Sequence, residues 1–457
     1  MIKRTIAQIA GMIPIQNDHS AFSDVSIKGV SINSRTMEPG NLFVPFKGEH
    51  TDGHRFVEDA LRKGAAAALW QQDVPNPPLH LPILVVEDTL KAVQQLSEAY
   101  RNELDIKVAG ITGSNGKTTV KDMTARLLSL KYKVQKTEGN YNNHLGLPLT
   151  LLSLEEDTEA AVLEMGMSGF GEIEFLTKLA RPDVVMITNI GESHLQDLGS
   201  RAGIAKAKLE IIEGLKDDGM IIYHGDEPLL KDRLDGYSGP AEVRSFGKGH
   251  SNSIYPVRID QEEKGSVFQT NLSDTEYHLP VLGVHNVMNA LCAMEAAHFL
   301  GIPYEQMDEG FASLKLTAMR MELSEGSKGE KVINDAYNAS PTSMRAAIDL
   351  VSELSGYSRK VLVLADMLEL GDDAVRFHRE IGLAIDPEKI DYVLTFGTLG
   401  RAIAEGAQEV FSEERVFAFS EKGPLIEKLQ SLMNAETIVL FKGSRGMKLE
   451  EAAEALQ

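Results

Sequence analysis

Apolar runs alternate with amphipathic segments along most of the chain. From Ile106 to about Leu316, the strand-like runs KVAGIT, AAVLEM, DVVMITNI and GMIIYHGDE are separated by segments of helical periodicity. Beyond residue 317, the runs KVINDAY, KVLVLADM, DYVLTFG and ETIVLFKGS are again separated by helical segments. Strands that alternate with helices usually pair in parallel through crossover helices. The pattern therefore predicts two α/β units, the second a doubly wound, Rossmann-like domain.

Two parts of the chain depart from this alternation. Residues 1–103 mix short apolar runs with turn clusters and end in the helical pattern LKAVQQLSEAYRNEL. Between about 241 and 280, short alternating segments such as SIYPVRI and SVFQTNL predict a small antiparallel sheet. We therefore expect an α/β protein of three domains, which comprise residues 1–103, 104–317 and 318–457.

Composition narrows the classes of function. The 457 residues carry a formal net charge of −21 that is spread along the chain, so we expect no nucleic-acid partner. The sequence contains no uninterrupted run of about 18 apolar residues, which is the pattern that predicts a membrane-spanning helix. Ile6, Ile9 and Ile13 recur at helical spacing, which favours a short amphipathic helix over a signal peptide. The single cysteine, Cys292, fits a core position in a protein of a reducing compartment.

The strand KVAGIT leads into the glycine-rich sequence GSNGKTT and then into a helical pattern. Strand, loop, lysine and helix are the parts of a P-loop, whose backbone N–H groups hold phosphate oxygens. Lys117 would neutralise the β and γ phosphates, and the Thr118 hydroxyl would bind Mg²⁺. Gly113 and Gly116 enclose two residues rather than the usual four. The spacing predicts a nucleotide site but argues against an ordinary GTPase or kinase, and an accidental Gly-Lys-Thr turn is the alternative.

Polar residues at other predicted strand ends and turns are further candidates. Glu164 ends the strand AAVLEM, where its carboxylate suits Mg²⁺, although a capping or solvated glutamate would look the same. His194 follows the strand DVVMITNI, but Mg²⁺ prefers oxygen ligands, so spacing alone indicates a surface or general-base histidine. Asn142 and Asn143 could bind a substrate through their amides or hold a turn through Asx hydrogen bonds.

Several longer motifs occur in order over nearly the whole chain: TGSNGKTT (112–119), GNYNNHLGLP (139–148), LEMG (163–166), TNIGESHL (188–195), AKAKLEI (205–211), HNVMNALCA (285–293), NDAYNASPTSM (334–344), LADMLELG (364–371) and FKGSRGM (441–447). Together they resemble the Mur ligase family, which builds the peptide stem of bacterial peptidoglycan. The resemblance implies a cytoplasmic, ATP- and Mg²⁺-dependent ligase that joins D-alanyl-D-alanine to UDP-N-acetylmuramoyl-tripeptide through an acyl phosphate. We expect it to act as a monomer.

The resemblance also implies a set of site residues. For the nucleotide it implies the residues of the loop: Gly113, Ser114, Asn115, Gly116, Lys117, Thr118 and Thr119. It also implies Asn289 near the adenine, and Arg320 and Asp335 at the phosphates and ribose respectively. The implied metal ligands are Thr118, Glu164, His194 and Lys208, and the implied catalytic residues are Lys117, Lys208 and His194. The implied substrate-binding residues are Ser34, Arg35, Asn142, Asn143, Tyr337, Asn338, Lys442 and Arg445.

Some of these residues have plainer explanations. Asn286 near the start of its helix could be an N-cap. Arg35 could be a surface arginine beside a turn, and Lys442 and Arg445 could form a solvated basic turn. The motif SINSRTMEPGNLFVPFKGEHTDGHRF resembles the uridine-diphosphate-binding domain of the family, but Asn33 stands where relatives often have aspartate.

Lys208 poses a chemical problem as a metal ligand, because an ammonium group has no lone pair to offer. In Mur ligases the lysine at this position is carbamylated by CO₂, which turns it into a carboxylate-like oxygen ligand. Helical spacing puts Lys206 on a different face from Lys208, so only one of the two should reach the metal site. The alternative is that both are solvated helix lysines.

Two other functions remain open at this point. Another amide ligase of the superfamily, such as the ligase that adds the third stem residue or folylpolyglutamate synthase, would share the nucleotide loop, but NDAYNASPTSM and LADMLELG argue against both. A non-catalytic P-loop protein would need the loop but not Glu164, His194 and Lys208 together.

Overall fold

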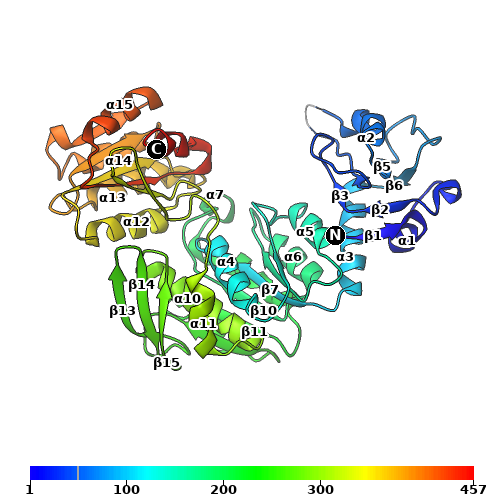
Figure 1. The fold of residues 1–457 in the computed structure, drawn as a ribbon, viewed down its shortest axis with the longest axis horizontal. Coiled ribbons are helices and arrows are strands. Elements are labelled where there is room, and N and C mark those ends of the chain that lie inside the picture. Colours follow the sequence, from blue (N-terminus) through cyan, green and yellow to red (C-terminus); the bar gives the residue numbers. More distant parts are fainter. Residues whose placement is uncertain (49–50) are drawn as a thin grey trace.

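Three groups of elements follow one another along an open arc (Figure 1). The computed structural model describes residues 1–48 and 51–457, so Glu49 and His50 of the N-terminal motif lie outside the described residues. The N-terminal elements (blue) and the C-terminal elements (yellow to red) stand at opposite ends, with the central elements (cyan and green) between them. The expected boundaries at 103/104 and 317/318 fall between elements, since α3 ends at Glu103, β7 begins at Lys107 and β16 begins at Glu322.

The N-terminal group carries two small sheets. β1 and β2 pair in antiparallel orientation, whereas β3-β4-β5-β6 form a parallel sheet. The predicted first helix is confirmed as α1, whose Ile6 and Ile9 are fully buried and which starts at a capping box of Thr5 and Gln8. The elements are β1 (Lys3–Thr5), α1 (Ile6–Met12), β2 (Ser26–Lys28), β3 (Val30–Ser31), β4 (Leu42–Phe43), α2 (Val57–Arg62), β5 (Ala67–Gln71), β6 (Ile83–Val86) and α3 (Thr89–Glu103).

Helix α3 joins the N-terminal group to the central group. The Tyr100 hydroxyl donates to the carbonyl of Leu154 at 2.8 Å, and the Arg101 guanidinium donates through Nε to the carbonyl of Ala180, also at 2.8 Å. Both side chains are buried, so these bonds satisfy polar groups that water cannot reach.

The central group is built on a six-stranded parallel sheet of order β12-β11-β10-β7-β9-β8. Helices cover both faces, which explains why the strand AAVLE is buried at every position. Helices α4 and α10 pack together on one face, and the apolar α10 buries Cys292 as expected. The sheet and its helices are β7 (Lys107–Thr112), α4 (Lys117–Leu128), β8 (Val134–Lys136), α5 (Gly146–Ser153), β9 (Ala160–Glu164), α6 (Glu172–Ala180), β10 (Val184–Ile187), α7 (Leu195–Leu198), α8 (Arg201–Leu209), β11 (Met220–His224), α9 (Pro228–Leu234), β12 (Glu242–Phe246), α10 (Val284–Phe299) and α11 (Met307–Ala312).

The predicted antiparallel sheet is confirmed in part. Strands β13 (Pro256–Glu262), β14 (Gly265–Thr270) and β15 (Ser273–Leu279) form an antiparallel sheet. The expectation was wrong for the start of that region, because residues 242–246 form β12 and pair in parallel with β11. A short strand satisfies its hydrogen bonds equally well in either sheet, so the alternating pattern does not reveal its partner.

The C-terminal group is a doubly wound sheet, as predicted, with one addition. Its order is β16-β17-β21-β18-β19-β20, parallel except for β16, an antiparallel edge strand that the sequence pattern did not predict. Alternate residues of β18 face opposite sides: Leu362 packs in the core that contains α12, α13 and α14, whereas Val363 packs in the core that contains α15 and α16. The elements are β16 (Glu322–Glu325), β17 (Lys331–Asn334), α12 (Pro341–Glu353), β18 (Arg359–Ala365), α13 (Ala374–Leu383), β19 (Tyr392–Phe396), α14 (Gly400–Ala407), β20 (Val416–Phe419), α15 (Lys422–Leu432), β21 (Thr437–Lys442) and α16 (Glu450–Glu454). Among the residues that the structure describes, no helix is both long and apolar enough to cross a membrane.

Candidate functional site

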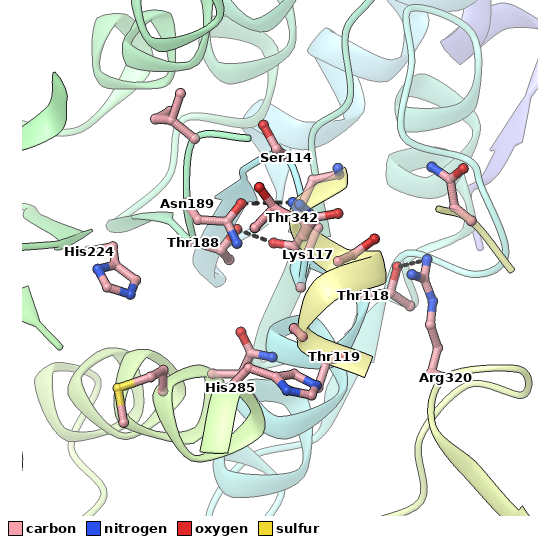
Figure 2. A pocket seen from close by; sticks show the side chains of 18 of the residues that line it. Ser114, Lys117, Thr118, Thr119, Thr188, Asn189, His224, His285, Arg320 and Thr342 are labelled. Carbon is pink, nitrogen blue, oxygen red and sulfur yellow. Dashed lines mark hydrogen bonds between the residues drawn. The ribbon is translucent and has the colours of Figure 1, made fainter. Parts of the chain in front are cut away.

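The glycine-rich loop joins the end of β7 to the first turn of α4. Its backbone is held by the segment after β10: the Ser114 N–H donates to the Asn189 carbonyl at 3.1 Å, and the Asn115 N–H donates to the Asn189 side-chain oxygen at 2.9 Å. The Thr188 hydroxyl donates to the Asn115 carbonyl at 2.5 Å (Figure 2). The residues that follow β10 therefore fix the shape of the loop at the N-terminus of α4, where backbone N–H groups can bind an anion.

Two glycines in this loop are required by space as well as by conformation. Gly113 and Gly116 have φ angles of +150° and +81°, which other residues adopt with strain. A Cβ atom at Gly113 would lie 1.8 Å from the Thr188 hydroxyl oxygen, and one at Gly116 would lie 2.6 Å from the Asn289 side-chain oxygen. The loop can therefore lie this close to its neighbours only with glycine at both positions.

Lys117 lies at the first position of α4 with its side chain folded back over the loop. Its ammonium group donates to the Gly113 carbonyl at 2.7 Å. Burial lowers the pKa of Lys117; the nearby Glu164 carboxylate opposes this shift, and the Arg320 guanidinium adds to it. Because nearby negative charge only partly compensates the buried Lys117 ammonium group, this group favours an anion bound beside it.

The Thr118 and Glu164 side chains meet at the carboxyl end of the parallel sheet. The Thr118 hydroxyl donates to one Glu164 oxygen at 3.0 Å, and the Asn142 amide donates to the other at 2.9 Å. Glu164 is only 4% exposed and is the last residue of β9, as predicted. These oxygen atoms could hold a hard cation such as Mg²⁺.

Residues from beyond the central group reach the same place. Arg320 donates through Nη2 to the Thr118 hydroxyl at 3.1 Å, and its guanidinium carbon lies 4.1 Å from the centre of the Tyr337 ring. Asp335, directly after β17, accepts a hydrogen bond from the Lys442 ammonium group, which also donates to the Asn338 carbonyl at 3.2 Å. Arg320, Tyr337 and Lys442 therefore line one cavity with the loop.

This cavity has a volume of about 730 Å³ and opens between the central and C-terminal groups. It is lined by most of the predicted site residues: Ser114, Asn115, Gly116, Lys117, Thr118, Thr119, Asn142, Asn143, Glu164, His194, Asn289, Arg320, Asp335, Tyr337, Asn338 and Lys442. A cavity of this size is large enough for a nucleotide-sized ligand.

The side chains of two asparagines in the cavity form hydrogen bonds with nearby backbone groups. The Asn143 side chain accepts hydrogen bonds from the N–H groups of Leu145 and Gly146 at 3.2 and 2.8 Å, which is the turn-holding arrangement. Asn286 is not an N-cap, because Gly283 occupies that position and the Asn286 amide instead donates to the Leu282 carbonyl.

His194 faces the C-terminal group. It adopts a left-handed conformation (φ +64°) before α7, and its Nδ1 lies 3.0 Å from a Glu369 oxygen. The hydrogen bond from His194 lowers the pKa of the Glu369 carboxyl. In the described residues no three His, Cys, Asp or Glu side chains gather into a metal-binding cluster.

The two helix lysines differ sharply. Lys208 on α8 is 2% exposed, and burial holds its pKa well below the ordinary value, with the Lys117 charge adding to the shift. Lys206 is exposed, and its ammonium group lies 5.4 Å from the centre of the Phe170 ring. The expectation that both could be solvated is therefore wrong for Lys208, and the expectation that they lie on different faces is confirmed.

Five predicted site residues do not line the cavity: Gly113, Lys208, Ser34, Arg35 and Arg445. Ser34 and Arg35 belong to the N-terminal group, where the Arg35 side chain is exposed. Arg445 pairs with Glu450 at 2.6 Å, away from the cavity that Lys442 lines.

Sequence reasoning assigned no role to several residues that line the cavity. His285 is partly buried at the start of α10, and desolvation lowers its pKa to about 4, although Asp335 opposes the shift. His224 ends β11 across the cavity from the loop, and burial lowers its pKa as well (Figure 2). Thr342 donates to Glu192 at 2.8 Å and so joins α12 to the loop after β10. His285 lies in the motif HNVMNALCA and Thr342 in NDAYNASPTSM, and the strand-end position of His224 was the available signal.

Comparison with known proteins agrees with this architecture. Residues 26–101 match the family described as Mur ligase family, catalytic domain; residues 111–297 match the Mur ligase middle domain; and residues 319–445 match the Mur ligase, glutamate ligase domain. The UDP-N-acetylmuramoyl-tripeptide–D-alanyl-D-alanine ligase of Bacillus subtilis (strain 168) is 51% identical over 456 residues, which cover 100% of this chain and 99% of the relative.

Two solved structures are also similar. MurF from Acinetobacter baumannii superposes with a TM-score of 0.90 at 30% identity, covering 100% of this chain and 99% of that one. MurF ligase from Thermotoga maritima, solved in complex with ADP, superposes with a TM-score of 0.82 at 28% identity, covering 94% and 97%. Fold, site and comparisons agree, and this chain belongs to the Mur ligase family.

Proposed function

We propose that this chain is an ATP-dependent ligase that joins D-alanyl-D-alanine to UDP-N-acetylmuramoyl-tripeptide. The observation that carries the proposal is one cavity in which the glycine-rich loop and Glu164 of the central group meet Arg320, Asp335 and Lys442. The name of the Bacillus subtilis relative, which matches over the full length of the chain, supports this reaction rather than that of another superfamily ligase.

The residues of the loop fit a nucleotide. The Ser114 hydroxyl, the Asn115 side-chain nitrogen (Nδ2) and the Arg320 Nε are buried and have no hydrogen-bond partner among the described residues. Unsatisfied buried donors are costly, and phosphate oxygens would satisfy them. ATP, when bound, would supply the phosphoryl group that activates the substrate carboxylate as an acyl phosphate. Lys117 and Arg320 would compensate the negative charge that develops around the transferred phosphoryl group.

The oxygens of Thr118 and Glu164 fit Mg²⁺, which usually binds through one or two protein ligands together with phosphate oxygens and water. We propose that a carbamylated Lys208 and His194 contribute to a second ion. Burial of Lys208 supports this, because a buried amine with a lowered pKa is neutral more often and can react with CO₂.

The substrate would span the molecule. We propose that Ser34 and Arg35 bind the uridine diphosphate, that Asn142 and Asn143 lie along the peptide, and that Tyr337, Asn338, Lys442 and Arg445 serve the acceptor side. We also propose that the chain acts as a monomer.

The test is ATP-dependent phosphate release by the purified protein with UDP-muramoyl-tripeptide, with and without D-alanyl-D-alanine. Substrates with lysine and with diaminopimelate at the third position are compared, and the pentapeptide product is identified by mass spectrometry. We expect release that depends on the dipeptide. Release that ignores the dipeptide, or none with either tripeptide, would refute the proposed reaction.

A further inference from the structure

A buried carboxylate outside the cavity connects the nucleotide loop to the segment that enters the C-terminal group. Asp122 lies on α4 and is 2% exposed. One of its oxygens accepts a hydrogen bond from the Lys136 ammonium group at 2.6 Å. The other accepts two, from the Thr317 N–H at 2.8 Å and from the Thr317 hydroxyl at 2.9 Å. A buried charge is tolerated only when it is fully partnered in this way.

The segment that follows Thr317 carries Arg320 to the loop. Met319 and Met321, on either side of Arg320, have φ angles of +60° and +53°, which are strained for residues other than glycine. Such a conformation persists only where the surroundings hold it. On the far side, the Met321 N–H donates to Asp335 at 3.2 Å. On the near side, the last hydrogen bond before the strained residues is the one between Thr317 and Asp122.

The two α4 residues that contact this segment, Thr118 and Asp122, lie on one face of the helix. Thr118, which Arg320 contacts at 3.1 Å, and Asp122, which binds Thr317, are four residues apart, so their side chains lie about 6 Å apart along the helix axis. The segment from Thr317 to Arg320 therefore runs back along the helix by about one turn. The Met319 N–H also donates to a Glu322 oxygen at 2.9 Å. Holding the start of the segment beside Asp122 therefore limits where the guanidinium of Arg320 can reach.

We propose that Asp122 is a positioning residue, which holds the segment 317–321 so that Arg320 meets Thr118 and the nucleotide phosphates. The inference rests on the proposed function for its link to catalysis. The ordinary alternative is that the Asp122–Lys136 ion pair only ties α4 to β8. The alternatives differ in one measurable respect: a residue that acts through Arg320 loses its effect once Arg320 is removed.

The experiment is a double-mutant cycle with Asp122→Asn and Arg320→Ala. It is measured on ADP affinity by calorimetry, which needs no ligation, and on kcat/KM for ATP in the ligation assay. Asparagine at 122 places an amide N–H₂ group against either Lys136 or Thr317. We expect Asp122→Asn alone to lower kcat/KM about tenfold, and to change it by less than about twofold in the Arg320→Ala background.

The matched control is Glu295→Gln. Glu295 is also 2% exposed and is paired with a half-exposed basic residue, Arg244, at 2.9 Å, but it lies outside the cavity. We expect it to lower the melting temperature like Asp122→Asn and to leave ADP affinity unchanged. Should Asp122→Asn fail to fold, Thr317→Val removes one of the two hydrogen bonds without charging the core, and we expect the same coupling to Arg320 with a smaller effect.

The outcomes separate the two proposals. An equal loss in both backgrounds, on ADP affinity and on kcat/KM, would overturn the positioning role. A wild-type protein that binds ADP but forms no product would refute the proposed ligase reaction, while the ADP cycle would still decide the role of Asp122.

Discussion

Alanine in place of Gly113 should disable the nucleotide loop. The added Cβ would lie 1.8 Å from the Thr188 hydroxyl oxygen and 3.0 Å from the Thr188 Cβ, and Thr188 is itself 2% exposed. Overpacking of this kind costs about 1–3 kcal/mol. Displacing Thr188 would also break its hydrogen bond to the Asn115 carbonyl, at about 1–3 kcal/mol for a buried group. The φ of +150° adds strain of about 1–3 kcal/mol.

The loop can relieve this cost only by leaving the shape that faces the cavity. A penalty of about 3 kcal/mol corresponds to a loss of more than 100-fold in affinity, so we expect ADP binding to weaken by at least about tenfold even if half of the strain relaxes elsewhere. Titration calorimetry with ADP measures the affinity, and scanning calorimetry measures the melting temperature.

A matched control separates the clash from the backbone conformation. Gly171 has a φ of +81°, but a Cβ there would meet nothing within 4 Å. Gly171→Ala should therefore lower the melting temperature slightly and leave ADP binding unchanged. Removing the hydroxyl in Gly113→Ala/Thr188→Ala should recover part of the affinity. Wild-type ADP affinity in Gly113→Ala would refute the account of the loop.

Substitutions of Lys117, Arg35 and Lys208, with Lys206 as a control, test the proposed roles. Lys117→Ala should abolish turnover, because it removes a positive charge that compensates the transferred phosphoryl group. It should not lower the melting temperature, because burial lowers the pKa of Lys117 and so disfavours its charged form in the fold. Near-normal turnover would contradict the P-loop assignment. Arg35→Ala should weaken binding of the UDP-linked substrate far more than binding of ADP, and calorimetry that finds both affinities unchanged would remove Arg35 from the substrate site. Lys208→Ala should lose most activity and regain part of it with formate or acetate, whereas Lys206→Ala should behave nearly as wild type; full activity of Lys208→Ala in CO₂-depleted buffer would exclude carbamylation as a requirement. Because burial lowers the pKa of Lys208, the neutral amine should form at a lower pH than in an ordinary lysine, so bicarbonate should reactivate CO₂-depleted enzyme already near neutral pH.

The sequence alone was sufficient for features that arise within one element or between neighbours in the chain. The helix at Ile6–Met12 and the loop between β7 and α4 follow from periodicity, capping and glycine positions, which are local. The same local signals misplaced residues 242–246, because their pattern is compatible with either sheet and only pairing with β11 decides between them.

Only the tertiary structure decided which distant residues share the cavity. Arg320 reaches Thr118 across 202 positions of sequence, and His194 meets Glu369 of the C-terminal group. Spacing put Lys206 and Lys208 on different faces of one helix, but packing of that helix determined which face became buried. Helical periodicity defines relative direction within an element, whereas burial depends on the elements that pack against it, and those are set by contacts between parts of the chain that are far apart in sequence.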